Sequence, residues 1–348
     1  MADVAFAIPG DLATPTGGYA YDREVMARLP RFGVEVRHVI LPASYPQPTP
    51  NDLAETARII ATFLPETILL IDGLAFGVMP ADLLTSIRQR IVALVHHPLG
   101  LEPGLTAARA AELFRLETAA LAFARRVVVT SPFTSGLLAR DFAVPRSAIT
   151  VASPGTERAT RARGTGTPLQ LLSVGSVTPR KGFTVLVDAL APLAVHDWRL
   201  TIAGPLDRDQ EAVTALRAAI ARHSLGDRIT MTGALGREAL DRHYDAADVF
   251  VLPSLFEGFG MVLTEAMARG LPIGCTTGGA AAETVPDAAA LKVAPGVAEP
   301  LSNALGQLII DPGLRQRLAD AAWQAGQHLP DWDETARTIA AVIREVAA

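Results

Sequence analysis

Short apolar runs alternate with longer stretches of helical periodicity along the whole chain. The runs have the length of strands and lack polar–apolar alternation, which is typical of parallel sheets covered on both faces. In the first half, the expected strands cover residues 4–9, 35–41, 67–72, 91–97, 126–131 and 148–153. In the second half, they cover residues 169–175, 199–204, 228–233, 248–254 and 271–276. Helical periods lie between them, for example at residues 21–32, 105–124 and 210–225.

Eleven strands are too many for one small sheet, so the pattern predicts an α/β fold with two doubly wound parallel-sheet domains, each Rossmann-like. The polar stretch ERATRARGTGTPL separates the two sets of strands, and we place a linker near residues 159–168. The expected domains are residues 1–160 and 168–330. A C-terminal helix over residues 331–348 is expected to pack back on the first domain.

Composition indicates a globular protein. Of 348 residues, 49% are apolar and 19% are charged. The single cysteine, Cys275, excludes an intramolecular disulfide and fits a reducing cytoplasm, where we expect the chain to reside. A net charge of −5 without any Lys/Arg run argues against nucleic-acid partners. Strong docking to anionic lipid is not expected either, while weak peripheral contact with the inner face of the membrane stays open.

Only two lysines occur in the chain, Lys181 and Lys292. Lys292 fits a surface strand. Arg180, Lys181 and Gly182 follow an expected strand and Gly175, at the start of a helix. Cations at a helix start oppose the helix dipole. The arrangement makes sense if both side chains reach outward to a bound diphosphate, which Arg contacts bidentately and Lys as a point charge.

A second chemistry-bearing stretch is LPSLFEGFGMVLTEAMARG, residues 252–270. Gly258 and Gly260 shape a tight loop after a strand, and a helix is expected to begin near Met261. Glu257 precedes this helix and Glu265 lies one turn inside it. Because a carboxylate accepts pairs of hydrogen bonds from neighbouring hydroxyls, the spacing fits one glutamate on a sugar ring and the other on a ribose.

The first half carries weaker signals. Gly17 and Gly18 permit close backbone approach just before a helix, where amides meet phosphate or sugar oxygens. His96 and His97 end a strand and point to opposite faces, so one of them is expected to line a cleft; we favour His97, which is nearer the loop. Glu102 in that loop is a candidate for facing an acceptor.

One further pattern, Asp207-Arg208-Asp209, has the D-x-D spacing of some metal sites. The arginine and the helix that follows favour a polar helix entry, and we predict no metal ligands and no cofactor.

Together, RKG at 180–182, SLFEGFG at 254–260 and EAMA at 265–268 resemble the motifs of the family 4 (group 1) retaining glycosyltransferases. The resemblance covers essentially the whole chain. It implies a GT-B architecture, with two facing Rossmann-like domains, an active cleft between them and no metal requirement. It also implies that Arg180 and Lys181 neutralise the donor diphosphate, that Glu265 holds the ribose and that Glu257 holds the sugar hydroxyls.

By the same resemblance, the amides of Phe259 and Gly260 lie near sugar or phosphate, and Gly18 caps a phosphate from the other domain. His97 or His96 faces the transferred sugar, and the backbone near Leu235 contacts the base. The remaining donor-binding positions are Gly17, Gly175, Gly258 and Met261. The sequence departs from the family at residues 154–157, which read PGTE where the family commonly has PNGVD.

The implied reaction is metal-independent transfer from a nucleotide-diphosphate sugar to an acceptor hydroxyl. No carboxylate nucleophile is evident in the first half, so we favour same-face attack assisted by the leaving phosphate. Two alternatives are a non-catalytic sugar-nucleotide-binding partner subunit and a sugar-nucleotide epimerase or hydrolase on the same fold. The donor base (UDP, GDP or ADP) and the acceptor (lipid, oligosaccharide or small metabolite) stay open.

Overall fold

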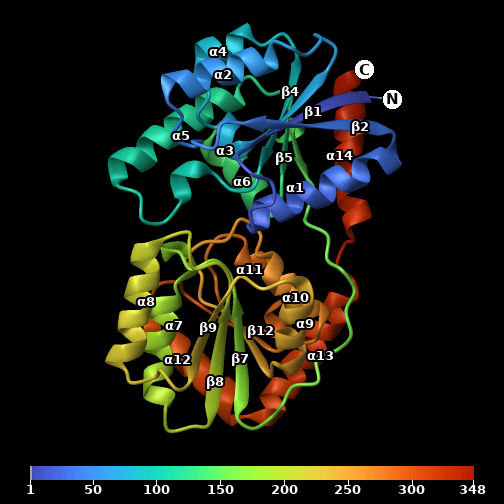
Figure 1. Cartoon of the computed structure of the whole chain (residues 1–348). Helices are drawn as coiled ribbons and strands as arrows, with labels where there is room; N and C mark the ends of the chain where they lie inside the picture. Colours follow the sequence, from blue (N-terminus) through green and yellow to red (C-terminus); the bar gives the residue numbers. More distant parts are fainter. Residues whose placement is uncertain (1) are drawn as a thin grey trace. The chain divides into compact units, whose positions relative to one another are not determined.

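The computed structural model describes residues 2–348, which form two compact units. The first unit extends to Gly155 and also includes Pro330–Ala348, and the second is Thr156–Leu329. The chain therefore leaves the first unit at Gly155 and returns to it for its last helix. Each unit contains one six-stranded sheet (Figure 1). All strand pairs of both sheets are parallel, which confirms the predicted fold class.

The sheet of the first unit has the order β2-β1-β3-β4-β5-β6. Its strands are β1 (Ala2–Pro9), β2 (Val34–Leu41), β3 (Ile68–Asp72), β4 (Arg90–Val95), β5 (Arg126–Val129) and β6 (Ile149–Val151). The central strand β3 is buried at every position, whereas the edge strand β2 alternates between buried and exposed residues. This contrast follows from their sequences, since β3 reads ILLID and β2 reads VEVRHVIL.

Helices and short 3₁₀ turns connect these strands. The helices are α1 (Gly17–Arg28), α2 (Pro50–Ile60), α3 (Gly73–Phe76), α4 (Ala81–Ser86), α5 (Ala107–Leu121) and α6 (Pro132–Asp141). The 3₁₀ turns are η1 (Leu29–Phe32), η2 (Leu99–Leu101) and η3 (Arg146–Ala148). The helix expected over 21–32 thus begins earlier, at the Thr16 N-cap, and its last turn tightens into η1 at Pro30.

The last helix, α14 (Trp332–Ala347), belongs to the first unit, where Figure 1 shows it beside α1. Its N-cap is Asp331, whose side chain accepts from the Glu334 amide. The hydroxyl of Thr335 donates to the Ser153 carbonyl at 2.7 Å, and the Trp332 ring packs against Tyr21. Gly155 has no room for a side chain, because a Cβ there would collide with the backbone of Trp332.

The sheet of the second unit has the order β12-β11-β10-β7-β8-β9. Its strands are β7 (Leu169–Val174), β8 (Trp198–Ala203), β9 (Ile229–Gly233), β10 (Val249–Leu252), β11 (Ile273–Thr276) and β12 (Ala290–Val293). The strand β12, which contains Lys292, adds a twelfth strand to the eleven that the apolar runs predict. It is short and only half-buried after its first residue, so its apolar signal is weak.

Figure 1 shows α7, α8 and α12 on one face of this sheet and α9, α10 and α13 on the other. The helices are α7 (Phe183–Leu190), α8 (Gln210–Arg222), α9 (Arg237–Ala246), α10 (Met261–Ala268), α11 (Ala281–Thr284), α12 (Ala298–Ile310) and α13 (Pro312–Gly326). The 3₁₀ turns are η4 (Pro179–Lys181), η5 (Ala191–Leu193) and η6 (Asp287–Ala289). Two apolar clusters, one on each face, form the core.

The polar stretch before β7 is bonded to the second unit. The amide of Ala162 donates to the Arg269 carbonyl at 2.8 Å, and Arg163 donates to the Asp245 carbonyl at 3.0 Å. Asp248 accepts from the amides of this stretch near residues 165–166. Backbone donors thus find partners although no regular element forms.

None of the helices described in residues 2–348 combines the length and the apolar character needed to cross a membrane.

Candidate functional site

The strand orders locate a candidate site in each unit. In the second unit, β7, β8 and β9 run toward one edge, and β10, β11 and β12 run toward the other. The order therefore reverses between β7 and β10, and in the first unit it reverses between β1 and β3. Ligands of open α/β sheets bind outside the carboxyl ends of the strands at such a switch point. The loops after β1, β7 and β10 carry many of the predicted site residues, whereas His96 and His97 follow β4 and Leu235 follows β9.

The loops after β7 and β10 are held together by their backbones. Gly182 adopts a left-handed φ of 63°, and a Cβ at this position would collide with the Pro253 carbonyl. The amide of Leu255 donates to the Arg180 carbonyl at 2.7 Å. Glycine at 182 is therefore required by both conformation and close approach. As a result, the cations after β7 lie against the carboxylate after β10.

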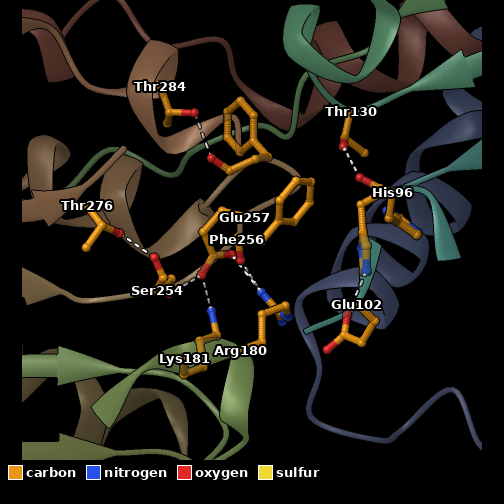
Figure 2. A network of polar contacts seen from close by, with 12 residues as sticks. His96, Glu102, Thr130, Arg180, Lys181, Ser254, Phe256, Glu257, Thr276 and Thr284 are labelled. Atoms are coloured by element: carbon orange, nitrogen blue, oxygen red, sulfur yellow. Dashed lines mark hydrogen bonds and ion pairs between the residues drawn. The ribbon is translucent and has the colours of Figure 1, made fainter. Parts of the chain in front are cut away.

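Glu257 accepts hydrogen bonds from both predicted diphosphate-binding cations (Figure 2). Lys181 Nζ lies 2.6 Å from Oε1, and an Arg180 guanidinium nitrogen lies 3.2 Å from Oε2. The hydroxyl of Ser254 donates to Oε1 at 2.5 Å. Only 7% of the Glu257 side chain and 11% of the Lys181 side chain are exposed. The RKG and SLFEGFG segments thus form one cluster rather than two solvated features.

The charge state of this cluster follows from its geometry. Burial alone would raise the pKa of Glu257, but Lys181 and Arg180 outweigh burial and lower it to about 2. Glu257 is therefore ionised at neutral pH, and one carboxylate faces two cations. The three side chains together carry a net positive charge at a switch point, which is an arrangement suited to an anion.

Gly175 makes room for the lysine. A Cβ at Gly175 would lie 2.9 Å from Lys181 Cε. The predicted site glycine after β7 therefore lets the lysine stem pass along the end of its strand toward Glu257.

The second predicted glutamate, Glu265, lies on α10 and contacts α9. The hydroxyl of Tyr244 donates to Glu265 Oε2 at 2.8 Å, and the Arg269 guanidinium lies 4.5 Å from the centre of the Tyr244 ring. Burial raises the pKa of Glu265, and Tyr244 and Arg269 counteract this rise. Leu235 packs against the same apolar cluster as Tyr244. Glu265 is thus separate from the Glu257 cluster and has its own partners.

The loop between the two glutamates has the predicted form. Helix α10 begins at Met261, and Gly260 precedes it with a left-handed φ of 92°. The hydroxyl of Thr284 donates to the Phe259 carbonyl at 2.6 Å and anchors the loop, which also contains Gly258. Phe259 and Gly258 therefore occupy a glycine-shaped turn whose backbone is fixed from α11.

The two histidines of the first unit have different partners. His97 Nε2 lies 2.9 Å from Glu102 Oε2, and both side chains are partly exposed. His96 Nε2 instead lies 3.2 Å from Asp22 Oδ1 and 3.4 Å from Asp72 Oδ2, and both aspartates are buried. Its carbonyl accepts from Thr130 (Figure 2).

The predicted glycine pair lies next to His96. Gly17 is the first residue of α1, and a Cβ at Gly18 would lie 3.3 Å from His96 Cδ2. The carboxyl ends of β1 and β4 thus bring together Gly18 and His96, whereas His97 and Glu102 pair in the loop beyond.

Sequence reasoning missed Asp22, Asp72 and Tyr244. Asp72 ends β3 at the switch point, and that position was a usable signal. Asp22 follows the glycine pair on α1, but nothing local shows that it turns inward. Tyr244 likewise gains its role only through contact with α10.

Asp207 and Asp209 form no metal cluster within the described residues. Asp209 is the N-cap of α8 and accepts from the Ala212 amide at 2.8 Å, in line with a polar helix entry. Asp207 is exposed beside Arg208. A cluster of a different kind, Asp22, Asp72 and His96, brings carboxylate and imidazole atoms within 4.8 Å of one another.

Comparison with known proteins links this geometry to one family. Residues 157–325 match the model of the family described as glycosyl transferases group 1. A D-inositol 3-phosphate glycosyltransferase of Xylanimonas cellulosilytica is 33% identical over 190 residues, or 53% of this chain and 45% of that protein. An MMP alpha-(1->4)-mannosyltransferase of Mycolicibacterium hassiacum is 28% identical over 280 residues, or 74% of this chain and 66% of that protein. The matched residues thus span about half to two thirds of the length of these two relatives.

Solved structures agree in fold along the whole chain. A sucrose-phosphate synthase from Thermosynechococcus elongatus superposes with a TM-score of 0.84 at 22% identity and covers 99% of both chains. Anabaena HepE, solved in complex with UDP-glucose, superposes with a TM-score of 0.78 at 18% identity, covering 99% of this chain and 100% of that one. At these identities, the likeness concerns the fold.

Proposed function

Because this chain belongs to the group 1 glycosyltransferases of the GT-B fold, we propose that it transfers a sugar from a nucleotide-diphosphate sugar to an acceptor hydroxyl. The donor binds to the second unit, and the acceptor binds to the first. Transfer retains the configuration of the sugar and needs no metal. Several relatives support sugar transfer by their names, among them the inositol-phosphate glycosyltransferase and the mannosyltransferase.

The observation that carries this proposal is the cluster of Arg180, Lys181 and Glu257. The leaving group of a nucleotide sugar is a diphosphate, whose developing charge has to be stabilised in the transition state. Arg180 and Lys181 supply two cations at the switch point of the second sheet. Glu257 holds both in place, and its ionised carboxylate retains lone pairs for the hydroxyls of the sugar.

The remaining residues take their roles from this placement. Glu265, oriented by Tyr244, binds the ribose hydroxyls. The backbone near Leu235 contacts the base, and the turn with Phe259 and Gly260 approaches the sugar or the phosphate. In this scheme the acceptor attacks from the face that the diphosphate leaves, and the departing phosphate takes the acceptor proton.

A non-catalytic partner subunit on the same fold is the competing function. Such a protein would be expected to lack a member of the diphosphate-binding set or one of the two glutamates. This chain keeps Arg180, Lys181, Glu257 and Glu265, and the first three are in hydrogen-bond contact. The complete set favours the transferase.

The test is nucleotide release from UDP-, GDP- and ADP-sugars in the presence of lipid, oligosaccharide and small-metabolite acceptors, each measured with and without EDTA. Arg180→Ala and Lys181→Ala should each lower turnover on the order of 100-fold or more, as expected when charge stabilisation of a transition state is lost. Lys292→Ala is the matched control, because it removes the only other lysine, which pairs with Asp287.

Unchanged turnover in both site variants would refute the assignment of the diphosphate site. Activity that EDTA abolishes and a divalent cation restores would refute metal independence.

A further inference from the structure

The imidazole of His96 lies between two buried carboxylates that come from different elements. Asp22 is on α1, Asp72 ends β3, and His96 follows β4. Nε2 lies 3.2 Å from Asp22 Oδ1 and 3.4 Å from Asp72 Oδ2. Neither aspartate side chain is more than 1% exposed, whereas 19% of the His96 side chain is exposed. Both carboxylates therefore face the same ring nitrogen from inside the unit.

Neither carboxylate has enough other partners to account for its burial. Asp72 Oδ1 accepts from the Leu74 amide at 2.8 Å as the N-cap of α3. Oδ2 of Asp22 and Oδ2 of Asp72 have no hydrogen-bond partner among the described residues. An ionised carboxylate is costly to bury without a compensating charge or hydrogen bond. The imidazole supplies that compensation only if Nε2 carries a proton.

The protonation state follows from these contacts. Burial alone would lower the pKa of His96, but Asp22 and Asp72 outweigh burial and raise it to about 10. Burial raises the pKa of Asp22 to about 6, because the lowering by His96 and Arg23 is smaller. Between these two values the ring is an imidazolium and Asp22 is ionised.

Other groups fix the orientation of the ring. Tyr21 packs edge-on against it, with ring centres 5.3 Å apart, and its own hydroxyl donates to the Ala152 carbonyl. Gly18 approaches the same Cδ2–Nε2 edge, since a Cβ there would lie 3.3 Å from Cδ2 and 3.4 Å from Nε2. Thr130 holds the His96 carbonyl. The side chain therefore has little freedom to turn Nε2 away from the aspartates.

An imidazolium fixed in this way is a donor and not a base. Both of its nitrogens carry protons, so it donates hydrogen bonds and has no lone pair to accept a proton. Nε2–H donates to Asp22 Oδ1, with Asp72 Oδ2 at 3.4 Å as a second negative charge, which leaves Nδ1–H as the other donor.

We propose that Asp22 and Asp72 are positioning residues that hold His96 as a hydrogen-bond donor to the transferred sugar and thereby exclude it as a general base. The part of the proposal that concerns the sugar rests on the proposed function. It identifies His96, rather than His97, as the residue that faces the sugar. It also excludes the most buried basic side chain of this loop as the general base of the acid–base pair that an epimerase or hydrolase would need.

The first test needs no substrate. Two-bond ¹H–¹⁵N NMR of histidine-labelled protein reports the protonation of each ring nitrogen, and His96→Gln assigns the signal among the seven histidines. In the wild type, the His96 ring should stay doubly protonated from pH 6 to pH 9. In Asp22→Asn and in Asp72→Asn, its pKa should fall by one unit or more. Asparagine keeps the size of each side chain, and at Asp72 it also keeps an N-cap.

Asp188→Asn is the matched control. It removes the carboxylate that lies 2.8 Å from His223 Nε2 in the second unit, so it should leave the signals of His96 unchanged. A wild-type His96 ring that is neutral at pH 7 would overturn the proposal. So would a ring whose signals change when EDTA is added, because the carboxylates would then hold a cation instead.

The second test follows kcat against pH once a transfer assay exists. Asp22→Asn should retain near-wild-type kcat at pH 6 and lose roughly half of it or more at pH 9, because a ring whose pKa has fallen by one unit is half deprotonated there, with little change in KM for the donor. A parallel pH profile of variant and wild type would refute the positioning role while leaving sugar transfer intact. If no transfer is found at all, the NMR result still decides the state of His96.

Discussion

Glu257 connects the chemistry of the site with the stability of the unit that contains it. Its carboxylate is buried, yet it is held in the ionised form by Lys181 and Arg180. The two cations depend on it in turn, because without a ligand they would face each other across a partly desolvated loop. Glu257 is therefore expected to contribute to folding as well as to function. Its contribution to the free energy of unfolding can be recognised by its pH dependence.

Glu257→Gln should lower the free energy of unfolding by about 3 kcal/mol at pH 7, as expected when one member of a buried ion pair is removed. The pKa of Glu257 lies below its ordinary value, so its stabilising contribution is present above about 4.5 and is lost as pH falls toward about 2. The difference between variant and wild type should therefore shrink at pH 3. Urea denaturation at both pH values measures it.

Glu211→Gln on α8 provides the control for this prediction, since Glu211 is exposed in the same unit. An equal loss of stability at pH 3 and pH 7 would mean that the charge of Glu257 does not account for its contribution.

Sequence reasoning recovers single residues where the local pattern is chemically odd. Two adjacent cations at a helix start, in a chain with only two lysines, drew attention to Lys181. The same reasoning did not find Asp22 and Tyr244, because an acidic or aromatic residue within a helical period gives no local sign of a function. Their roles arise from contacts with His96 and Glu265, which lie 74 and 21 residues away along the chain.

At the scale of elements, α5 carries a buried carboxyl group whose pKa shifts in the opposite direction to that of Glu257. Glu117 on this helix accepts from the Leu99 amide at 2.9 Å, which anchors η2 in the loop that follows His97. Its other oxygen, Oε1, has no hydrogen-bond partner among the described residues. Burial raises the pKa of Glu117 to about 8, and the Leu99 amide counteracts only part of this rise.

Because the pKa of Glu117 is raised, the first unit should be less stable at alkaline pH. The folded state holds a proton on Glu117 that the unfolded state releases near pH 4.5, so stability falls as pH rises from about 4.5 through about 8. Glu117→Gln should remove this dependence and raise the stability at pH 9, relative to the wild type, by on the order of a few kcal/mol. Thermal denaturation at pH 6 and pH 9 provides the comparison.

Glu112→Gln on the same helix is the matched control, because that carboxylate is exposed and pairs with Arg109. A wild type whose stability between pH 6 and pH 9 changes no more than that of Glu117→Gln would contradict the prediction.

Strands are predicted well where their apolar runs are continuous, as in β3 and β10, because burial on both faces imposes such runs. The strand β12 is short and half-buried, so it is missing from the eleven apolar runs. The assignment of Lys292 to a strand was correct, but only 13% of its side chain is exposed. The start of α1 was placed too late, because its first turn contains the glycine pair that usually marks a loop.

At the scale of the whole molecule, a single rule locates the site residues of both units. Each sheet reverses its strand order once, and the loops at these reversals carry Gly18 and Asp72 in the first unit and Lys181 and Glu257 in the second. Because strand and helix alternate throughout, the sequence predicts two parallel sheets, but it does not predict their strand order. It does not predict that the chain leaves the first unit at Gly155. The sequence PGTE departs from the family there, and a side chain at Gly155 would collide with the backbone of Trp332.

The central claim is that the second unit binds a nucleoside diphosphate through Lys181. Thermal denaturation with UDP, GDP and ADP, and with their sugars, tests it most directly, because a ligand that binds the folded state raises Tm in proportion to ln(1 + [L]/Kd). We predict that one base raises Tm in the wild type and in Lys292→Ala but not in Lys181→Ala. A wild type that no nucleotide stabilises, or a shift that Lys181→Ala retains in full, would contradict the account.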